Sequence, residues 1–321
     1  GWVGMQRFFF FFLFVAGKQS LEARNYPEAE RRLALAHAWN PWTDVYTSLY
    51  AQAYAQEARA QLAQNPSASQ LPRITALLSR AERLNAQARS QNPDRVESWL
   101  AAASIASTRD ALIPPMRRSR DDLAALTRAQ SLDPSNPQTV LLLANAYLDR
   151  AEQVQTWLES KDETIKTEAR LWFDEATREA QNWFARADQL QPQLQGVSAG
   201  QARLALLKGD LEGAIRALEV LQQEGYATQD IRIQTALLYE QAGKADLATR
   251  LFEAIIQDHP TDPAPLARWS LARLYALNGR LDDALILLEA LAKQFPQESI
   301  IQQQLGELRQ ARLEQDRALM K

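Results

Sequence analysis

The sequence has 321 residues, of which 46% are apolar and 23% are charged, a composition that excludes general disorder. The net charge is only −3, with acidic and basic residues mixed along the chain, which excludes the electrostatic pattern of a nucleic-acid-binding protein. Cysteine is absent, which excludes disulfides, thiol catalysis and thiolate metal sites, and the two histidines are too few for a histidine metal cluster; no cofactor is expected. The abundance of helix-forming residues predicts an all-helical chain, and its length predicts two domains or an array of repeats.

The chain begins with an aromatic run, because residues 8–16 read Phe-Phe-Phe-Phe-Phe-Leu-Phe-Val-Ala. Nine residues of helix reach about 14 Å, against roughly 30 Å for the hydrocarbon core of a bilayer, and Arg7 interrupts an extension toward Trp2. A complete transmembrane helix is therefore not expected. The order of Met5-Gln6-Arg7, an apolar core and small residues is typical of a secretory signal, while the start at Gly1 suggests processing or a fragment.

The aromatic run also fits the first helix of a repeat. Counting back from Ala29 places Gly17 at a small-residue position, so residues 1–24 are predicted to form an aromatic-rich helix that merges into the first repeat. Consecutive phenylalanines point in every direction around a helix, and each Phe left in water forfeits roughly 1.5–3 kcal/mol relative to burial. The run must therefore be covered, either by another protein subunit or by membrane or detergent. The first alternative predicts a subunit interface made of Trp2, Phe8, Phe9, Phe10, Phe11, Phe12 and Phe14.

A pattern of small and large apolar residues recurs before proline along the chain. Ala29, Leu33, Ala36 and Pro41 stand at steps of four, three and five, which keep the first three on one helix face. The small residues permit close approach of a partner helix, and the large residue fills the space between the helices. The same steps recover Ala180, Phe184, Ala187 and Pro192, then Ala248, Phe252, Ile255 and Pro260, then Ala284, Leu288, Leu291 and Pro296.

A first helix and a glycine turn precede these sets in the later part of the chain. Ala236 and Tyr239 stand 12 and 9 positions before Ala248, and Gly209 and Gly243, which suit tight turns, are 34 positions apart. At these residues the chain resembles the tetratricopeptide repeat family, whose period is 34 residues. The resemblance implies an all-α, right-handed superhelical solenoid of helix pairs, several with lengthened helices, that binds other proteins and is not an enzyme.

About seven repeats are expected across residues 10–298, followed by a C-terminal capping helix at 299–321. Two of them depart from the pattern: Asn85 occupies a large apolar position in one, and Leu221 and Tyr226 replace the small residue and the proline in another. The expected repeats span 10–43, 44–95, 96–136, 137–194, 195–228, 229–264 and 265–298.

Three of these repeats are longer than the family's unit. Their additional residues fall in the stretches 54–81, 106–122 and 147–180, between the first and second helix of each repeat. Such turns share one edge of a solenoid, so lengthened helices are predicted to project there together. Insertions gathered on one face are typical of a contact surface, and tolerated surface loops are the alternative interpretation.

Candidates for catalytic chemistry are weak. The stretch Gly17-Lys18-Gln19-Ser20 lacks the earlier glycine and the preceding strand of a phosphate loop. The pairs Asp121-Asp122 and Asp282-Asp283 stand at expected helix starts, where carboxylates interact favourably with the helix dipole. His37 and His259 are expected to be surface or capping residues.

A concave groove of first helices is the expected binding surface. Its predicted wall consists of Leu100, Leu141, Asn145, Ile233, Leu266, Trp269 and Arg273. Relatives that bind a peptide carboxylate present Lys, Arg and Asn there, a pattern that only Asn145 and Arg273 resemble. The wall therefore favours an apolar helix or extended segment, unless several of these residues are ordinary core between repeats.

Two hypotheses about function follow. In the first, the aromatic segment of one copy is buried on the next, which gives a homopolymeric filament, tube or ring, expected at the surface of a bacterium. In the second, residues 1–16 are the end of a membrane helix, and the solenoid is a tethered adaptor for a different protein. The second resembles the tetratricopeptide tails that follow the membrane segments of some bacterial surface-glycan ligases.

Overall fold

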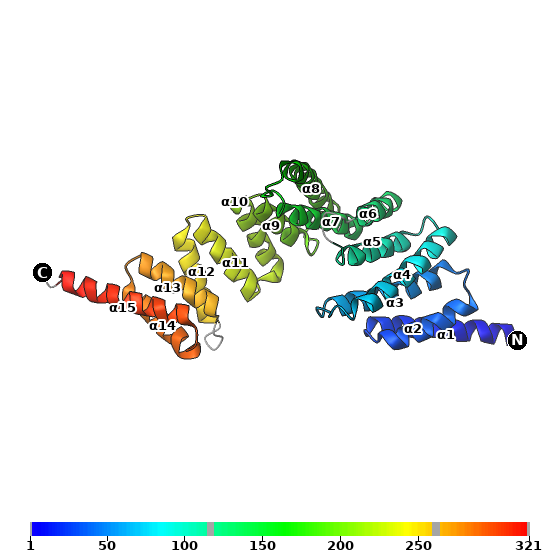
Figure 1. Ribbon diagram of the computed structural model, residues 1–321, viewed down its shortest axis with the longest axis horizontal. Helices are drawn as coiled ribbons and strands as arrows, with labels where there is room; N and C mark the ends of the chain where they lie inside the picture. Colours follow the sequence, from blue (N-terminus) through cyan, green and yellow to red (C-terminus); the bar gives the residue numbers. More distant parts are fainter. Residues whose placement is uncertain (1, 114–118, 259–263, 320–321) are drawn as a thin grey trace. The chain divides into compact units, whose positions relative to one another are not determined.

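The computed structural model describes residues 2–113, 119–258 and 264–319, with side chains for residues 11–113, 119–258 and 264–317. These described residues form helices joined by turns and contain no strand, which confirms the predicted all-α class (Figure 1). The chain divides into two compact units, Gly1–Leu194 and Gln195–Lys321, which are described separately below.

In the first unit, consecutive helices pack against each other as pairs. The pairs are α1 (Trp2–Glu22) with α2 (Tyr26–Trp39), α3 (Asp44–Leu62) with α4 (Leu71–Gln91), α5 (Val96–Asp110) with α6 (Asp121–Leu132), and α7 (Pro137–Gln155) with α8 (Glu163–Leu190).

In the second unit the same arrangement of paired helices continues. The pairs are α9 (Val197–Leu207) with α10 (Leu211–Leu221), α11 (Gln229–Gln241) with α12 (Ala245–Asp258), and α13 (Pro265–Leu277) with α14 (Leu281–Gln294), and α15 (Ser299–Leu319) packs on α14. A π-helical turn, η2 (Gln222–Tyr226), follows α10 in the repeat that lacks the proline, and the chain turns there at Gly225, whose φ is 95°.

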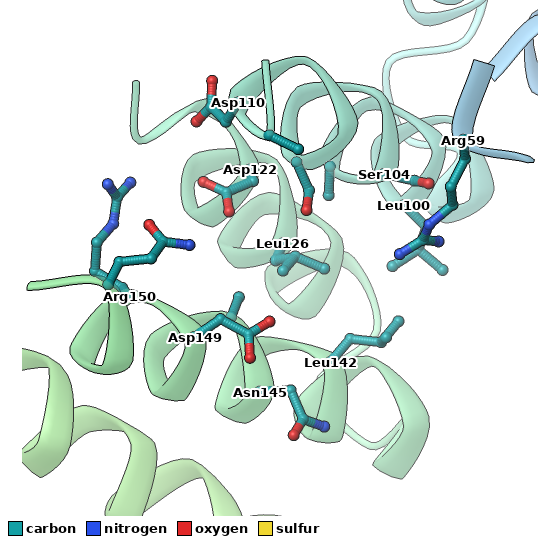
Figure 2. A pocket seen from close by; sticks show the side chains of 15 residues that line it. Arg59, Leu100, Ser104, Asp110, Asp122, Leu126, Leu142, Asn145, Asp149 and Arg150 are labelled. Atoms are coloured by element: carbon teal, nitrogen blue, oxygen red, sulfur yellow. The ribbon is translucent and has the colours of Figure 1, made fainter. Parts of the chain in front are cut away.

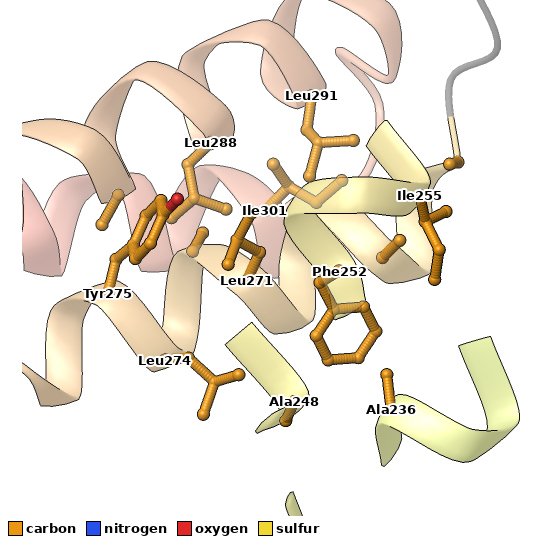
Figure 3. Packing of buried hydrophobic residues seen from close by; sticks show 14 of the residues in the cluster. Ala236, Ala248, Phe252, Ile255, Leu271, Leu274, Tyr275, Leu288, Leu291 and Ile301 are labelled. Carbon is orange, nitrogen blue, oxygen red and sulfur yellow. The ribbon is translucent and has the colours of Figure 1, made fainter. Parts of the chain in front are cut away.

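The predicted small and large apolar positions form the contacts between paired helices. Ala29, Leu33 and Ala36 of α2 are each 0% exposed, because α1 and α3 cover this face. The corresponding residues of α8, α12 and α14 are buried as well. In the second unit, the buried side chains of α11 to α15 form one continuous cluster around Phe252 and Leu288 (Figure 3).

Capping side chains and turn glycines mark where these helices begin and end. The side chains of Asn25, Asn136 and Asp162 accept hydrogen bonds from backbone N–H groups in the first turns of α2, α7 and α8. Gly243 ends the turn between α11 and α12 with a φ of 74°, which a residue with a side chain adopts at a cost.

The three insertions of the first unit have different structures. Two are lengthened helices as predicted, because α3 and α4 have 19 and 21 residues and α7 and α8 have 19 and 28. The insertion between α5 and α6 does not lengthen a helix, since α5 ends at Asp110 and α6 begins at Asp121. Pro114 disfavours helical conformation at the preceding residue, Ile113, which lies outside α5.

Candidate functional site

A pocket of about 500 Å³ opens in the first unit between α5, α6 and α7. Its apolar lining comes from Leu100, Leu126 and Leu142, together with alanines of α5 and α7. Polar side chains of the same helices, and Arg59 near the end of α3, complete it (Figure 2). We refer to this feature as the α5–α7 pocket; its lining residues are Arg59, Leu100, Ala103, Ser104, Ser107, Asp110, Ala111, Asp122, Leu126, Leu142, Asn145, Ala146, Asp149, Arg150 and Gln153.

Carboxylates gather at one end of the pocket. Asp110, Asp122 and Asp149 lie there with Arg150, whereas Arg59 lies at the opposite end beside Leu100 (Figure 2). Arg150 is buried, and its Nη2 donates a hydrogen bond of 2.6 Å to the backbone oxygen of Ser119. This arrangement gives the pocket an acidic end and a basic end.

Burial changes the pKa of a carboxyl group at the acidic end. It raises the pKa of Asp122 above its usual value, and the neighbouring Asp110 charge adds to the increase, while Arg150 opposes it. Asp110 is only 5% exposed. The buried Oδ1 atoms of Asp110 and Asp122 accept no hydrogen bond from the described residues, although Arg109 Nη2 lies 3.5 Å from Asp110 Oδ1 as an ion pair.

The residues predicted for the groove fall in both units. Leu100 and Asn145 line the α5–α7 pocket, and Asn145 Nδ2 donates a hydrogen bond of 3.0 Å to the backbone oxygen of Leu141. Leu141 itself is 7% exposed and belongs to the core. The structure therefore brings together two of the three groove residues predicted in the first unit.

The other four predicted groove residues lie in the second unit. Ile233 and Trp269 are partly buried against its core cluster, and Leu266 is exposed. Arg273 is exposed and forms an ion pair with Glu240 at 2.6 Å. Its guanidinium, which a clamp would use to bind a peptide carboxylate, is thus already paired with a carboxylate of the chain. These residues belong to α11 and α13, the first helices of adjacent pairs.

The predicted aromatic interface is described in part. Phe11 and Phe12 are 55% and 62% exposed on α1. Phe14 is partly buried and stacks on Tyr46 of α3, with ring centroids 4.6 Å apart. The remaining predicted interface residues, Trp2, Phe8, Phe9 and Phe10, lie outside the residues whose side chains the structure describes. None of the helices, so far as their residues are described, is long and apolar enough to cross a membrane.

The acidic residues of the pocket were not predicted as a site. Asp121 does pair with Arg109 at the start of α6, at 2.8 Å, but its neighbour Asp122 enters the pocket. A signal was present in the spacing, because Ser104, Ser107 and Asp110 stand at steps of three on one face of α5. The repeat pattern, which was read from apolar residues, did not include these polar positions and therefore did not predict the pocket.

Of the two histidines, only His37 lies among the described residues. His37 is partly buried, which lowers its pKa, and its Nδ1 lies 3.2 Å from the hydroxyl of Thr47. His259 lies outside the described residues. Across the part of the chain that the structure describes, His, Asp and Glu side chains form no group of three that could hold a metal ion.

Comparisons with known proteins agree on the type of repeat. Residues 239–312 match the family model of the tetratricopeptide repeat. No curated protein matches the sequence significantly.

Solved structures resemble the chain over most of its length. PilW, described as a widely conserved type IV pilus biogenesis factor, is 16% identical with a TM-score of 0.52, and the match covers 79% of this chain and 94% of PilW. A tetratricopeptide repeat protein from Parabacteroides merdae is 13% identical with a TM-score of 0.48, covering 93% of this chain and 98% of that chain. YrrB, a tetratricopeptide protein with an unusual peptide-binding site, is 16% identical with a TM-score of 0.47, covering 68% and 96%.

The match to PilW shows that paired helices of this type extend well beyond the residues that the family model matches. The predicted fold class is thereby confirmed. Residues 239–312 match the tetratricopeptide repeat by sequence, and the paired helices of the described chain have the fold of tetratricopeptide repeat proteins.

Proposed function

We propose that the protein is a non-enzymatic scaffold that binds a segment of another protein in the α5–α7 pocket. The observation that carries this proposal is the pocket itself, which combines about 500 Å³ of space with an apolar lining and polar groups from two first helices. A cavity of this kind suits a few side chains of a bound segment. Leu100 and Asn145, which the sequence placed in the groove, belong to its lining.

Site-specific photocrosslinking in the cells that naturally make the protein tests this proposal. A photoreactive amino acid replaces Leu142, which is 48% exposed in the pocket, and in a second variant replaces Leu171, which is 66% exposed on α8 outside the pocket. We expect an adduct of one defined mass from position 142 and none from position 171. Equal adducts from both positions, or none from position 142, would contradict the proposal.

A second function, self-association into a filament, tube or ring, is favoured by the aromatic surface of α1. Phe11 and Phe12 are more than half exposed, and Trp42, before α3, is 84% exposed. Exposed apolar groups that form a contiguous patch mark protein–protein or membrane contact sites. A second copy of the chain would cover them in a homopolymer, and a membrane would cover them in the tethered adaptor.

The substitutions Phe11→Gln and Phe12→Gln, made together, test self-association. We expect them to convert assemblies into monomers in sedimentation velocity, without detergent, whereas Leu171→Gln on α8 should leave the assemblies unchanged. Deletion of residues 1–16 should likewise give folded monomers. A protein that is monomeric before substitution and floats with lipid vesicles would instead identify the aromatic surface as a membrane contact.

A location at the surface of a bacterium belongs to the same proposal. Its support is the resemblance of the fold to PilW, whose description names a role in pilus biogenesis. Fractionation of the producing cells tests the location. We expect the protein in the envelope fraction, and its detection in the cytosol alone would contradict the proposal.

A further inference from the structure

A second pocket, of about 450 Å³, opens in the first unit between α4, α5 and α6. It lies on a different face of α5 from the α5–α7 pocket, and the two pockets share no lining residue. We refer to it as the α4–α6 pocket. Its floor is made of small and apolar side chains, namely those of Ala86, Ala102, Ile105, Ala106, Ala124 and Ala125.

Arg89 stands at one end of this pocket without an anionic partner. Its guanidinium lies over the ring of Trp99, with Cζ 4.8 Å from the ring centroid, and the indole N–H of Trp99 donates to the backbone oxygen of Pro93 at 2.7 Å. Asp94, which follows α4, pairs with Arg128 instead, at 3.1 Å. Among the described residues, Arg89 has no partner for a hydrogen bond or an ion pair.

The donors of Arg89 that remain free are at the tip of its guanidinium. Nε is fully buried, whereas Nη1 and Nη2 keep access to the outside of the protein. Contact with Trp99 uses the face of the planar guanidinium, so its edge is left to donate hydrogen bonds. The stacking also restricts the side chain, which lowers the entropy that a ligand must remove on binding.

The charges around the pocket are divided between its two ends. At the end opposite Arg89, Arg109 pairs with Glu82 at 3.1 Å and with Asp121 at 2.8 Å, and Asp110 faces it at 3.5 Å, so this end is acidic on balance. Glu82 and Arg89 are seven positions apart on α4, which separates them by about 10 Å along the helix. A bound anion is therefore attracted to the Arg89 end and repelled from the other end.

We propose that the α4–α6 pocket binds the carboxylate of an aspartate or glutamate side chain in a segment of a partner protein. The tip of the Arg89 guanidinium presents two parallel N–H donors, which match the two oxygens of a carboxylate. The alanine floor accepts apolar residues on either side of the acid. This site goes beyond the proposed function, because it is separate from the α5–α7 pocket.

A peptide pair that differs only in charge tests the proposal on the intact chain. The probes are acetyl-Ala-Leu-Glu-Leu-Ala-amide and the same peptide with glutamine in place of glutamate. Binding is followed by NMR through ¹³C-labelled alanine methyl groups, including those of Ala86 and Ala124, with Ala146 of the α5–α7 pocket as the reference signal. We expect the glutamate peptide to shift the Ala86 and Ala124 signals and to bind about tenfold more tightly than the glutamine peptide.

Substitutions locate the contact. Arg89→Gln should reduce the affinity for the glutamate peptide about tenfold, to that of the glutamine peptide, whereas Arg186→Gln, at an exposed position of α8 outside the pocket, should not. Ala124→Leu fills the pocket from an exposed position of α6 and leaves Arg89 unchanged. It should also weaken binding about tenfold, and it keeps the test valid if Arg89→Gln prevents folding.

Three results would overturn the proposal. The first is equal binding of the glutamate and glutamine peptides, and the second is a shift of the Ala146 signal while the Ala86 and Ala124 signals stay unmoved. The third comes from acetyl-Ala-Leu-Gln-Leu-Ala with a free C-terminal carboxylate: if this peptide binds as tightly as the glutamate peptide, the pocket recognises a chain end and the assignment to an acidic side chain is wrong.

Discussion

The hydroxyl of Tyr275 donates a hydrogen bond of 2.6 Å to Glu253, which joins the first helix of one pair to the second helix of the pair before it. The same relationship occurs twice more: Tyr54 of α3 donates to Glu30 of α2, at 2.7 Å, and Tyr239 of α11 donates to Glu219 of α10. A tyrosine on a first helix and a glutamate on the preceding second helix are thus a recurrent polar link between pairs. The link complements the apolar contacts, because it fixes the register of adjacent pairs by a directional bond.

We predict that Tyr275→Phe lowers the free energy of unfolding by about 1–2 kcal/mol, because it removes a hydrogen bond to a carboxylate and leaves the ring in place. Urea unfolding measures the change. Glu253→Leu and the double variant complete a double-mutant cycle. Additive effects of the two substitutions would show that the hydrogen bond contributes nothing.

The link also predicts a dependence on alkaline pH. Burial and the hydrogen bond to Glu253 raise the pKa of Tyr275 from about 10 to about 12. Because the folded pKa is the higher one, the stabilisation is fully present below pH 10 and is lost as the pH rises through 12. The difference in stability between the wild type and Tyr275→Phe should therefore shrink between pH 9 and pH 11.5. A difference that stays constant over this range would contradict the assignment.

Gly17 should tolerate no side chain. A Cβ atom at this position would lie 2.8 Å from Cγ and Cδ2 of Leu33, which is fully buried between α1 and α2. We expect Gly17→Ala to destabilise the first unit by about 1–3 kcal/mol, because the two helices must move apart.

Gly306 provides the matched control. It lies in α15, and an added Cβ would meet nothing within 4 Å. Gly306→Ala should raise stability by up to about 1 kcal/mol through helix propensity. Thermal unfolding of the two variants compares them directly, and a Gly17→Ala protein as stable as the wild type would disprove the close approach.

The helix pairs were predictable because their contacts obey a short-range rule. Ala29 and Leu33 lie on one helix face at a step of four, and the close approach that buries them depends on the residues themselves. Proline and glycine mark most ends of the helices for equally local reasons. Where the local signal fails, at Tyr226, the chain takes a π-helical turn that the pattern does not predict.

The pocket was less predictable because it depends on how three helices pack. Asp121 and Asp122 are adjacent in sequence and have the same local environment at the start of α6. Only the position of α6 against α5 and α7 makes one of them an exposed ion-pair partner and the other a pocket residue. The predicted groove residues were chosen for their place on first helices, a criterion that Leu141 also meets although it is buried.

Asn85 yields the last prediction, since it occupies a position of α4 that the repeat pattern reserves for a large apolar residue. It is 1% exposed, its Oδ1 accepts no hydrogen bond from the described residues, and it borders a pocket of about 450 Å³. Asn85→Leu should raise the free energy of unfolding by about 1–3 kcal/mol, because it removes a buried acceptor without a donor and adds apolar contact.

Asn145 is the control for this substitution, since it is partly exposed and its side-chain amide donates to the backbone oxygen of Leu141. Asn145→Leu gives up that bond and should bring no comparable gain in urea unfolding. If Asn85→Leu proves destabilising while Asn145→Leu is neutral, then Asn85 has a partner that stabilises it in the folded protein, and the interpretation of the position as an unsatisfied core residue is wrong.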